Sequence, residues 1–249
     1  MLLYRQPNPR EHQGEAISHW ARPPLLFVGL CAAFAFPVMP VSVSVLVLLT
    51  TKLGVDWYVA WHSVAICYSI SSALVILLIV TFGERRSIRS LGFRGFSGMD
   101  FGYGLATFIA IEVATKMISS PTSTFAVVAA RMQPNGGQEF FEQLPLWHRL
   151  AGAVVMSFAE EVCTRGYALE RIETILESTW LAGLMVWTLS TVPHILFWGW
   201  RATVTIAPGE ALFVILYLKK RSIAPCIIAH VLTDTYAEIW SLLPSAIRW

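Results

Sequence analysis

A small set of ionisable residues lies inside strongly apolar stretches of this sequence. Glu160, Glu161 and Arg165 stand at the end of one apolar run, and His194 and His230 lie in two later runs. Ionisable groups at membrane depth are rare and costly in free energy, so they indicate a functional site. Because the set combines acids, bases and a cation, it indicates proton-transfer chemistry inside a bilayer.

The spacing within this set predicts different roles for the two neighbouring acids. Glu161 and Arg165 are four residues apart, so on a helix they share one face and are expected to form an ion pair. Glu160 points about 100° away from Glu161 and lacks that cation, which suits a general base or acid. The alternative is that both glutamates simply face water at the end of a helix.

The two histidines are expected at the depth of Glu160. Counted at 1.5 Å per residue, all three residues lie on the order of 12 to 20 Å below one membrane surface. Pro193 directly precedes His194 and is expected to bend its helix and to help open a polar pocket. His230 and Asp234 are four residues apart, so we expect a hydrogen bond that orients the imidazole.

The overall composition predicts a membrane protein. The chain is 55% hydrophobic and only 14% charged, with a mean hydropathy of +0.59, which is too apolar for an ordinary soluble domain. A net charge of +2 without basic runs interleaved with aromatic residues gives no reason to expect a nucleic-acid partner. The four cysteines have no paired spacing, so neither a disulfide framework nor a zinc finger is predicted.

The apolar runs predict an all-α, polytopic transmembrane bundle of seven to eight helices. The predicted spans are 24–50, 57–82, 99–118, 147–169, 180–200, 203–218 and 222–243. Pro37 and Pro40 are expected to kink or split the first span, and 121–146 is either a loop or an eighth short helix. Since no repeat or long linker is present, we expect a cytoplasmic segment at 1–23 and one membrane-embedded domain at 24–249.

Lysine and arginine residues collect on two of the predicted connections. The 83–98 connection carries four arginines, and 219–221 reads Lys-Lys-Arg. With seven helices both connections lie on the side of the N-terminus, and the positively charged side is expected to face the cytoplasm. The sequence therefore predicts a multi-pass integral membrane protein with a cytoplasmic N-terminus.

The order of these motifs resembles that of the CPBP family of intramembrane proteases, which includes the CAAX prenyl endopeptidases and the bacterial Abi proteins. Glu-Glu-x-x-x-Arg at 160–165 is followed by a histidine in the next helix and by His-x-x-x-Asp at 230–234. Arg-Arg-Ser-Ile-Arg-Ser-Leu-Gly-Phe at 85–93 also resembles the family's cytoplasmic loop. The resemblance implies an endopeptidase that cleaves a membrane-anchored peptide or protein, either a CAAX-type substrate or a bacterial sorting or precursor sequence.

The resemblance also implies roles for individual residues. Glu160 and His194 would activate the attacking water, and His230 with Asp234 would orient or stabilise the oxyanion of the tetrahedral intermediate. Supporting contacts would come from Glu161 and Arg165.

Two positions depart from the family pattern. Ser190 stands four residues before His194, where the family usually has Phe, which implies a more polar pocket wall or a different substrate. Asp234 stands where Asn is common, and an ionised Asp cannot donate a hydrogen bond to an oxyanion. We therefore interpret Asp234 as a partner that keeps His230 charged.

The sequence leaves the chemical details of the site open. No cofactor is expected, with zinc as the alternative, because Glu160, His194 and His230 also match a two-His-one-carboxylate zinc site. Cys163 is a second alternative as a nucleophile, although we favour its interpretation as a core residue. Glu210 has no partner nearby in the sequence and is a candidate for the wall of a substrate cavity.

A non-catalytic function is the alternative to the protease. The same charges could lock helices together in a membrane scaffold, an immunity protein or a transporter-like protein. The common depth of an acid, two histidines and a cation favours the protease. In either case the lipid bilayer is the expected environment.

Overall fold

The computed structural model describes residues 23–34, 48–120 and 143–242, and in these residues it is all-α, as predicted. The elements with defined bounds are α2 (Pro23–Ala33), α4 (Trp57–Leu78), η1 (Ile79–Gly83), η2 (Ile88–Leu91), α5 (Gly98–Ser119), α8 (Leu146–Glu161), η3 (Val162–Leu169), α9 (Glu170–Leu176), α10 (Thr179–Thr191), α11 (His194–Lys220) and α12 (Ala224–Trp240). The predicted kink at Pro37 and Pro40, nearly all of the N-terminal segment and most of the 121–146 connection lie outside the described residues.

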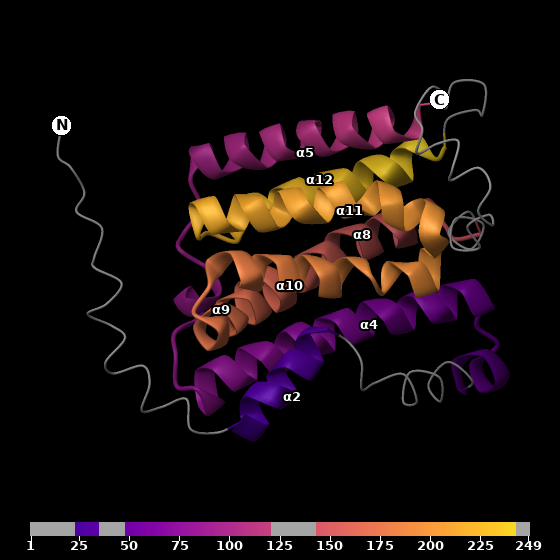
Figure 1. Ribbon diagram of the computed structural model, residues 1–249. Coiled ribbons are helices and arrows are strands. Elements are labelled where there is room, and N and C mark those ends of the chain that lie inside the picture. Colours follow the sequence, from indigo (N-terminus) through magenta and orange to yellow (C-terminus); the bar gives the residue numbers. More distant parts are fainter. Residues whose placement is uncertain (1–22, 35–47, 121–142, 243–249) are drawn as a thin grey trace.

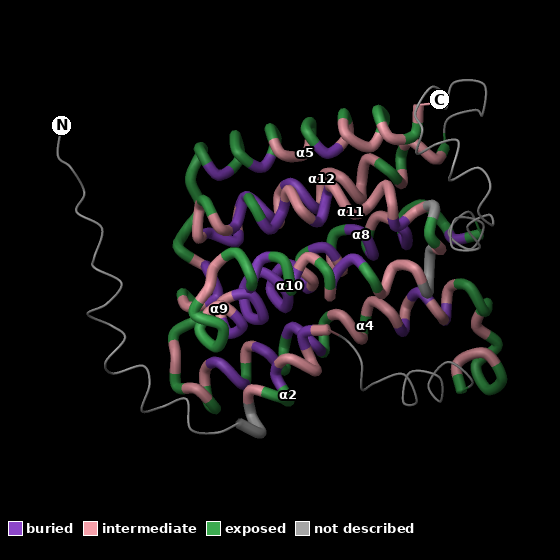
Figure 2. The backbone as a smooth tube through the Cα atoms, in the orientation of Figure 1, coloured by how far each residue is buried: buried purple, intermediate pink, exposed green. Residues whose placement is uncertain are grey.

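The long helices lie side by side, with α5 at one margin of the bundle and α4 with α2 at the other (Figure 1). α8, the π-helix η3 and α9 follow one another without a break, and we call this stretch the central helix (146–176). It contacts α2, α4, α10 and α12, and its η3 part is buried throughout (Figure 2). The central helix therefore carries the polar residues of 160–165 into the interior of the bundle.

The outer surface of the bundle is apolar. Among the described residues, three helices are long and apolar enough to cross a membrane, namely Trp57–Gly83, Gly98–Ser119 and Ala202–Lys220. Large apolar side chains such as Leu74, Phe82 and Met117 point outward and are exposed on these or adjoining turns. Because a soluble monomer rarely leaves so much apolar surface in contact with water, this surface is that of a membrane protein.

The ends of the outer helices are fixed by local side-chain contacts. The Asp56 carboxylate accepts hydrogen bonds from the backbone N–H groups of Tyr58 and Val59, which caps α4. Ser97 and Asp100 form a reciprocal capping box at the start of α5. These caps satisfy the otherwise unpaired N–H groups of each first turn and fix where each helix begins.

The two basic connections meet at one end of the bundle, as the sequence predicts. The Ile223 N–H, in the turn between α11 and α12, donates to the Gly92 carbonyl at 3.1 Å. Gly92 has a φ of +83°, and a Cβ there would lie 3.0 Å from the Tyr217 ring. Only glycine fits this close approach without strain. Gly92 therefore lets the 83–98 connection pack against the end of α11.

The structure corrects the predicted boundaries around His194. The helix predicted at 180–200 ends at Thr191, and α11 begins at His194 and continues to Lys220. Pro193 has no N–H to continue the hydrogen-bond ladder, and the backbone of Gly199 (φ 75°, ψ 170°) takes up a kink inside α11. His194 therefore lies at a helix start rather than well inside a continuous helix.

Candidate active site

The central helix places Glu160, Glu161 and Arg165 where α8 passes into the π-helix η3. Glu161 and Arg165 are fully buried, whereas Glu160 is only partly buried. A π-helical segment adds a residue to the turn and is frequent at functional sites, because it changes which side chains face inward. The two neighbouring glutamates therefore have different surroundings, as their spacing predicts.

Arg165 is held by carboxylates from two helices. Its Nη1 lies 3.0 Å from Glu161 Oε1, the pair expected from the four-residue spacing, and its Nη2 lies 2.5 Å from Glu210 Oε2. The guanidinium also lies 5.3 Å from the centroid of the Phe213 ring. We call Glu161, Arg165 and Glu210 the inner arginine cluster. It ties α11 to the central helix.

Glu210 is the residue of this cluster that sequence reasoning did not place. It is 3% exposed and pairs with an arginine 45 positions away. The signal in the sequence was an acid in an apolar helix with no partner within four residues. Since a buried acid is almost always paired, that signal predicts a distant cation but does not say which one.

His230 joins α12 to the same cluster. Its Nδ1 lies 2.8 Å from Glu161 Oε1, the oxygen that also contacts Arg165, and its ring stacks on Phe213 at 4.7 Å. Its Nε2 lies 3.5 Å from Asp234 Oδ2, which is long for a hydrogen bond. Glu161, rather than the expected Asp234, is therefore the closer partner that orients this imidazole.

Asp234 has a different close partner. Its Oδ2 accepts a hydrogen bond from the Ser157 hydroxyl at 2.6 Å, and its side chain is 39% exposed. Ser157 lies on α8, one turn before Glu161, and is buried. Asp234 therefore links α12 to the central helix while it remains open to solvent or a ligand.

The break before α11 fixes the orientation of His194. Its Nδ1 lies 2.8 Å from the carbonyl oxygen of Ser190, in the last turn of α10, where helix carbonyls lack their usual partners. A carbonyl can only accept, so Nδ1 carries the proton and Nε2 of the neutral ring presents its lone pair. Ser190, which replaces the usual Phe, contributes here through its backbone.

Glu160 lies in the same region as both histidines and the inner arginine cluster. It interacts electrostatically with His194, His230, Glu210 and Arg165. Its carboxylate forms no hydrogen bond or salt bridge within the described parts of the chain, although its backbone carbonyl accepts from Thr164. Unlike Glu161, it is therefore available to hold a water molecule or a substrate proton.

The arrangement of acids and histidines does not form a ready metal site. Within residues 23–34, 48–120 and 143–242, no group of three His, Cys, Asp or Glu side chains is placed to hold one ion. Zinc coordination by Glu160, His194 and His230 would require these side chains to move closer together. The zinc alternative stays a prediction.

Cys163 is enclosed by apolar side chains. It is 3% exposed and belongs to the hydrophobic core together with Tyr167, Val186 and Tyr217. A nucleophilic thiolate needs an electropositive and partly open position. This packing agrees with the interpretation of Cys163 as a core residue.

Comparison with known proteins supports the resemblance seen in the motifs. Residues 142–236 match the family model described as type II CAAX prenyl endopeptidase Rce1-like. No curated protein and no solved structure gives a match to the chain. The matched segment runs from just before α8 into α12 and includes all three motifs, Glu-Glu-x-x-x-Arg, His194 and His-x-x-x-Asp. This segment of the chain is therefore similar to the type II CAAX prenyl endopeptidases.

Proposed function

We propose that this protein is an intramembrane endopeptidase that hydrolyses a peptide bond of a membrane-anchored substrate with water activated by Glu160 and His194. The observation that carries the proposal is the contrast between two adjacent acids. Glu161 is engaged by Arg165 and His230, whereas the Glu160 carboxylate interacts electrostatically with both histidines and has no hydrogen bond or salt bridge to another described residue. The engaged acid supports the site, and the unengaged acid is available for proton transfer.

Water activation follows from the positions of Glu160 and His194. Glu160 takes a proton from the water molecule while the water oxygen attacks the carbonyl carbon of the scissile bond. His194 holds that water through Nε2, because the Ser190 carbonyl keeps the proton on Nδ1. When the tetrahedral intermediate collapses, the carbon–nitrogen bond breaks and Glu160 returns the proton to the leaving amine.

Stabilisation of the oxyanion is assigned to His230. Both of its ring nitrogens face carboxylate oxygens, and Nε2 is the less committed of the two at 3.5 Å. A proton on Nε2 can therefore be donated to the developing negative charge on the carbonyl oxygen. Asp234 cannot donate when it is ionised, so its role is to balance the charge of His230.

The substrate is expected to carry a membrane anchor. The site lies between helices whose outer surfaces are apolar, so a substrate held in the bilayer reaches it at high local concentration. The family description names prenyl endopeptidases of the CAAX type. A peptide that ends in a prenylated cysteine and three further residues is therefore the first substrate to test.

Cleavage by the purified chain in liposomes tests the proposal. Two reporter peptides of equal sequence, one prenylated and one anchored by a transmembrane helix, are incubated with wild type and His194→Ala, and products are identified by mass spectrometry. We expect a single cut, slowed roughly 100-fold or more in the variant. A prenyl requirement identifies CAAX-type specificity, and cleavage of both peptides indicates a broader specificity. If the folded wild-type protein cleaves neither reporter, the result would favour the alternative function, a non-catalytic membrane scaffold.

A further inference from the structure

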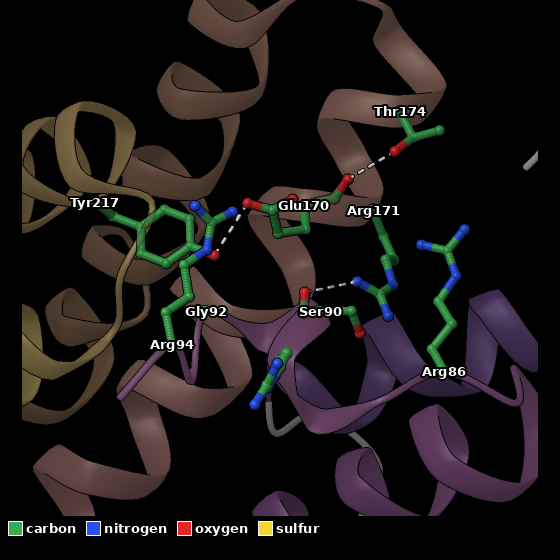
Figure 3. Close-up of a pocket in the computed structure, with 9 residues that line it drawn as sticks. Arg86, Ser90, Gly92, Arg94, Glu170, Arg171, Thr174 and Tyr217 are labelled. Atoms are coloured by element: carbon green, nitrogen blue, oxygen red, sulfur yellow. Dashed lines mark hydrogen bonds between the residues drawn. The ribbon is translucent and has the colours of Figure 1, made fainter. Parts of the chain in front are cut away.

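A cavity lined by arginines lies at the end of the bundle where the two basic connections meet. Its volume is about 120 Å³. The lining residues are Arg86, Arg89, Ser90, Gly92, Arg94, Glu170, Arg171, Thr174 and Tyr217. They come from the 83–98 connection, the α9 part of the central helix and the end of α11 (Figure 3). The cavity is therefore built by three segments that are far apart in the sequence.

The cavity has an excess of positive charge. Four arginines line it against one carboxylate, that of Glu170. Glu170 is already engaged, because its Oε1 accepts from the Tyr217 hydroxyl at 2.9 Å and lies 3.1 Å from Arg221 Nη1. Arg171 pairs with Glu84. Burial and the neighbouring Arg171 guanidinium lower the pKa of Arg86, while Glu84 and Glu170 raise it.

Two of the four arginines remain available to a ligand. Arg89 and Arg94 are exposed, and neither forms a salt bridge with a carboxylate in the described parts of the chain. Arg94 lines the cavity together with Tyr217 (Figure 3). A bound anion would thus contact the exposed guanidinium groups of Arg89 and Arg94, next to the buried Arg171.

The remaining polar group and the size of the cavity fit a phosphate. The Ser90 hydroxyl is buried without a hydrogen-bond partner among the described residues, so it can donate to an anion. A volume of about 120 Å³ is roughly that of four water molecules, enough for one phosphate group but not for a nucleotide. Arginine forks match the oxygen geometry of phosphate.

The surroundings of the cavity favour a lipid as the source of that phosphate. Three large apolar side chains are exposed next to the arginines: Phe82 just before the 83–98 connection, and Ile88 and Phe96 within it. Apolar residues beside basic ones are typical of a segment at the boundary between headgroups and acyl chains. Basic pockets between helices at this level bind anionic headgroups.

We infer that the arginine cavity between 86–94 and the α9 segment binds the phosphate group of an anionic phospholipid. The inference is independent of the proposed protease activity, because it concerns a surface at the end of the bundle. The arginines of the 83–98 connection would then bind a ligand, in addition to setting the orientation of the protein in the membrane.

Titration of the full chain in a neutral detergent tests the inference. The ligands are dioctanoyl phosphatidate, dioctanoyl phosphatidylcholine and inorganic phosphate, with binding measured by calorimetry. The test variant is Arg89→Gln/Arg94→Gln. The matched control, Arg85→Gln/Lys219→Gln, removes two exposed charges from the same end of the bundle that do not line the cavity. Melting temperatures check that both variants fold.

Wild type and the control are expected to bind phosphatidate, with phosphatidylcholine much weaker. The test variant should lose on the order of 10- to 30-fold in affinity for phosphatidate. If wild type binds inorganic phosphate as tightly as phosphatidate, and the test variant loses both, the phosphate site is supported, with free phosphate as its ligand. Equal loss in both double variants would overturn the inference, since it would show attraction to the basic surface in general. Absence of binding by wild type would overturn it as well.

Discussion

Two arginine clusters join the central helix to α11, and they differ mainly in depth. In the inner arginine cluster the side chains of Arg165, Glu161 and Glu210 are 0%, 0% and 3% exposed. In a second group, which we call the end arginine cluster, Arg221 contacts Glu170 and Glu173, and the exposures are 29%, 28% and 21%. Each cluster has one arginine and two glutamates.

This difference in depth predicts different energetic roles for similar contacts. Taking a charge out of water costs several kcal/mol, so each member of a buried cluster depends on its partners. A partly exposed ion pair contributes only about 1 kcal/mol or less, because water competes for both charges. We therefore expect the inner arginine cluster to maintain the geometry of the candidate active site, and the end arginine cluster mainly to fix the turn after α11.

The largest difference is expected between Arg165→Gln and Arg221→Gln. The first variant removes the guanidinium that pairs with both buried carboxylates, Glu161 and Glu210, so we expect it to lower the free energy of unfolding by about 3 to 5 kcal/mol. The second should lower it by about 1 kcal/mol or less. Denaturant unfolding of both proteins in mixed micelles, followed by tryptophan fluorescence, measures the two losses.

A double variant and added salt sharpen this comparison. Arg165→Gln/Glu210→Gln removes one buried carboxylate along with the cation, so it should be more stable than Arg165→Gln alone. Raising the salt concentration should shrink the effect of Arg221→Gln and leave that of Arg165→Gln nearly unchanged, since buried charges are poorly screened. Equal losses at both arginines would show that depth does not separate the two clusters.

The pH dependence of the end arginine cluster is expected to be small but measurable. Burial alone would raise the pKa of Glu173, but hydrogen bonds from Arg221 and Thr179 lower it below 4.5. The folded state thus favours the ionised carboxylate, whose contribution is complete above about pH 4.5 and is lost as the pH falls through the lower folded pKa. The melting temperatures of wild type and Glu173→Gln should differ at pH 6 and converge at acidic pH. A constant difference would contradict this assignment.

Metal removal is expected to have no effect on turnover. Glu160 and His194 are proposed to activate water directly, so prolonged chelation followed by exchange into metal-free buffer should leave the cleavage rate unchanged. Elemental analysis of the same sample provides the control. About one zinc per chain, with activity lost on chelation and restored by zinc, would instead support coordination by Glu160, His194 and His230.

The sequence predicts the local parts of this site well. Glu161 and Arg165 pair as their spacing requires, because an i,i+4 contact depends only on helix geometry. The all-α fold and the meeting of the two basic connections follow from apolar periodicity and from charge distribution. The different surroundings of Glu160 and Glu161 follow from the angle between consecutive residues.

The contacts that the sequence misses all depend on tertiary packing. The Arg165–Glu210 pair joins residues 45 positions apart, and His230 prefers Glu161 to its helical neighbour Asp234. Neither contact has a local spacing that would identify it. The helix start at His194 was also missed, because a proline can either kink a helix or end it, and the sequence does not say which occurs at Pro193.

The proposed division of labour between the two adjacent glutamates is tested most directly by the cleavage rate of Glu160→Gln. The control is Glu112→Gln, which changes another partly buried glutamate, on α5 outside the site. We expect Glu160→Gln to cleave the membrane-anchored reporter at least roughly 100-fold more slowly than wild type, at an unchanged melting temperature, while Glu112→Gln cleaves at the wild-type rate. A Glu160→Gln protein that keeps wild-type turnover would contradict the account.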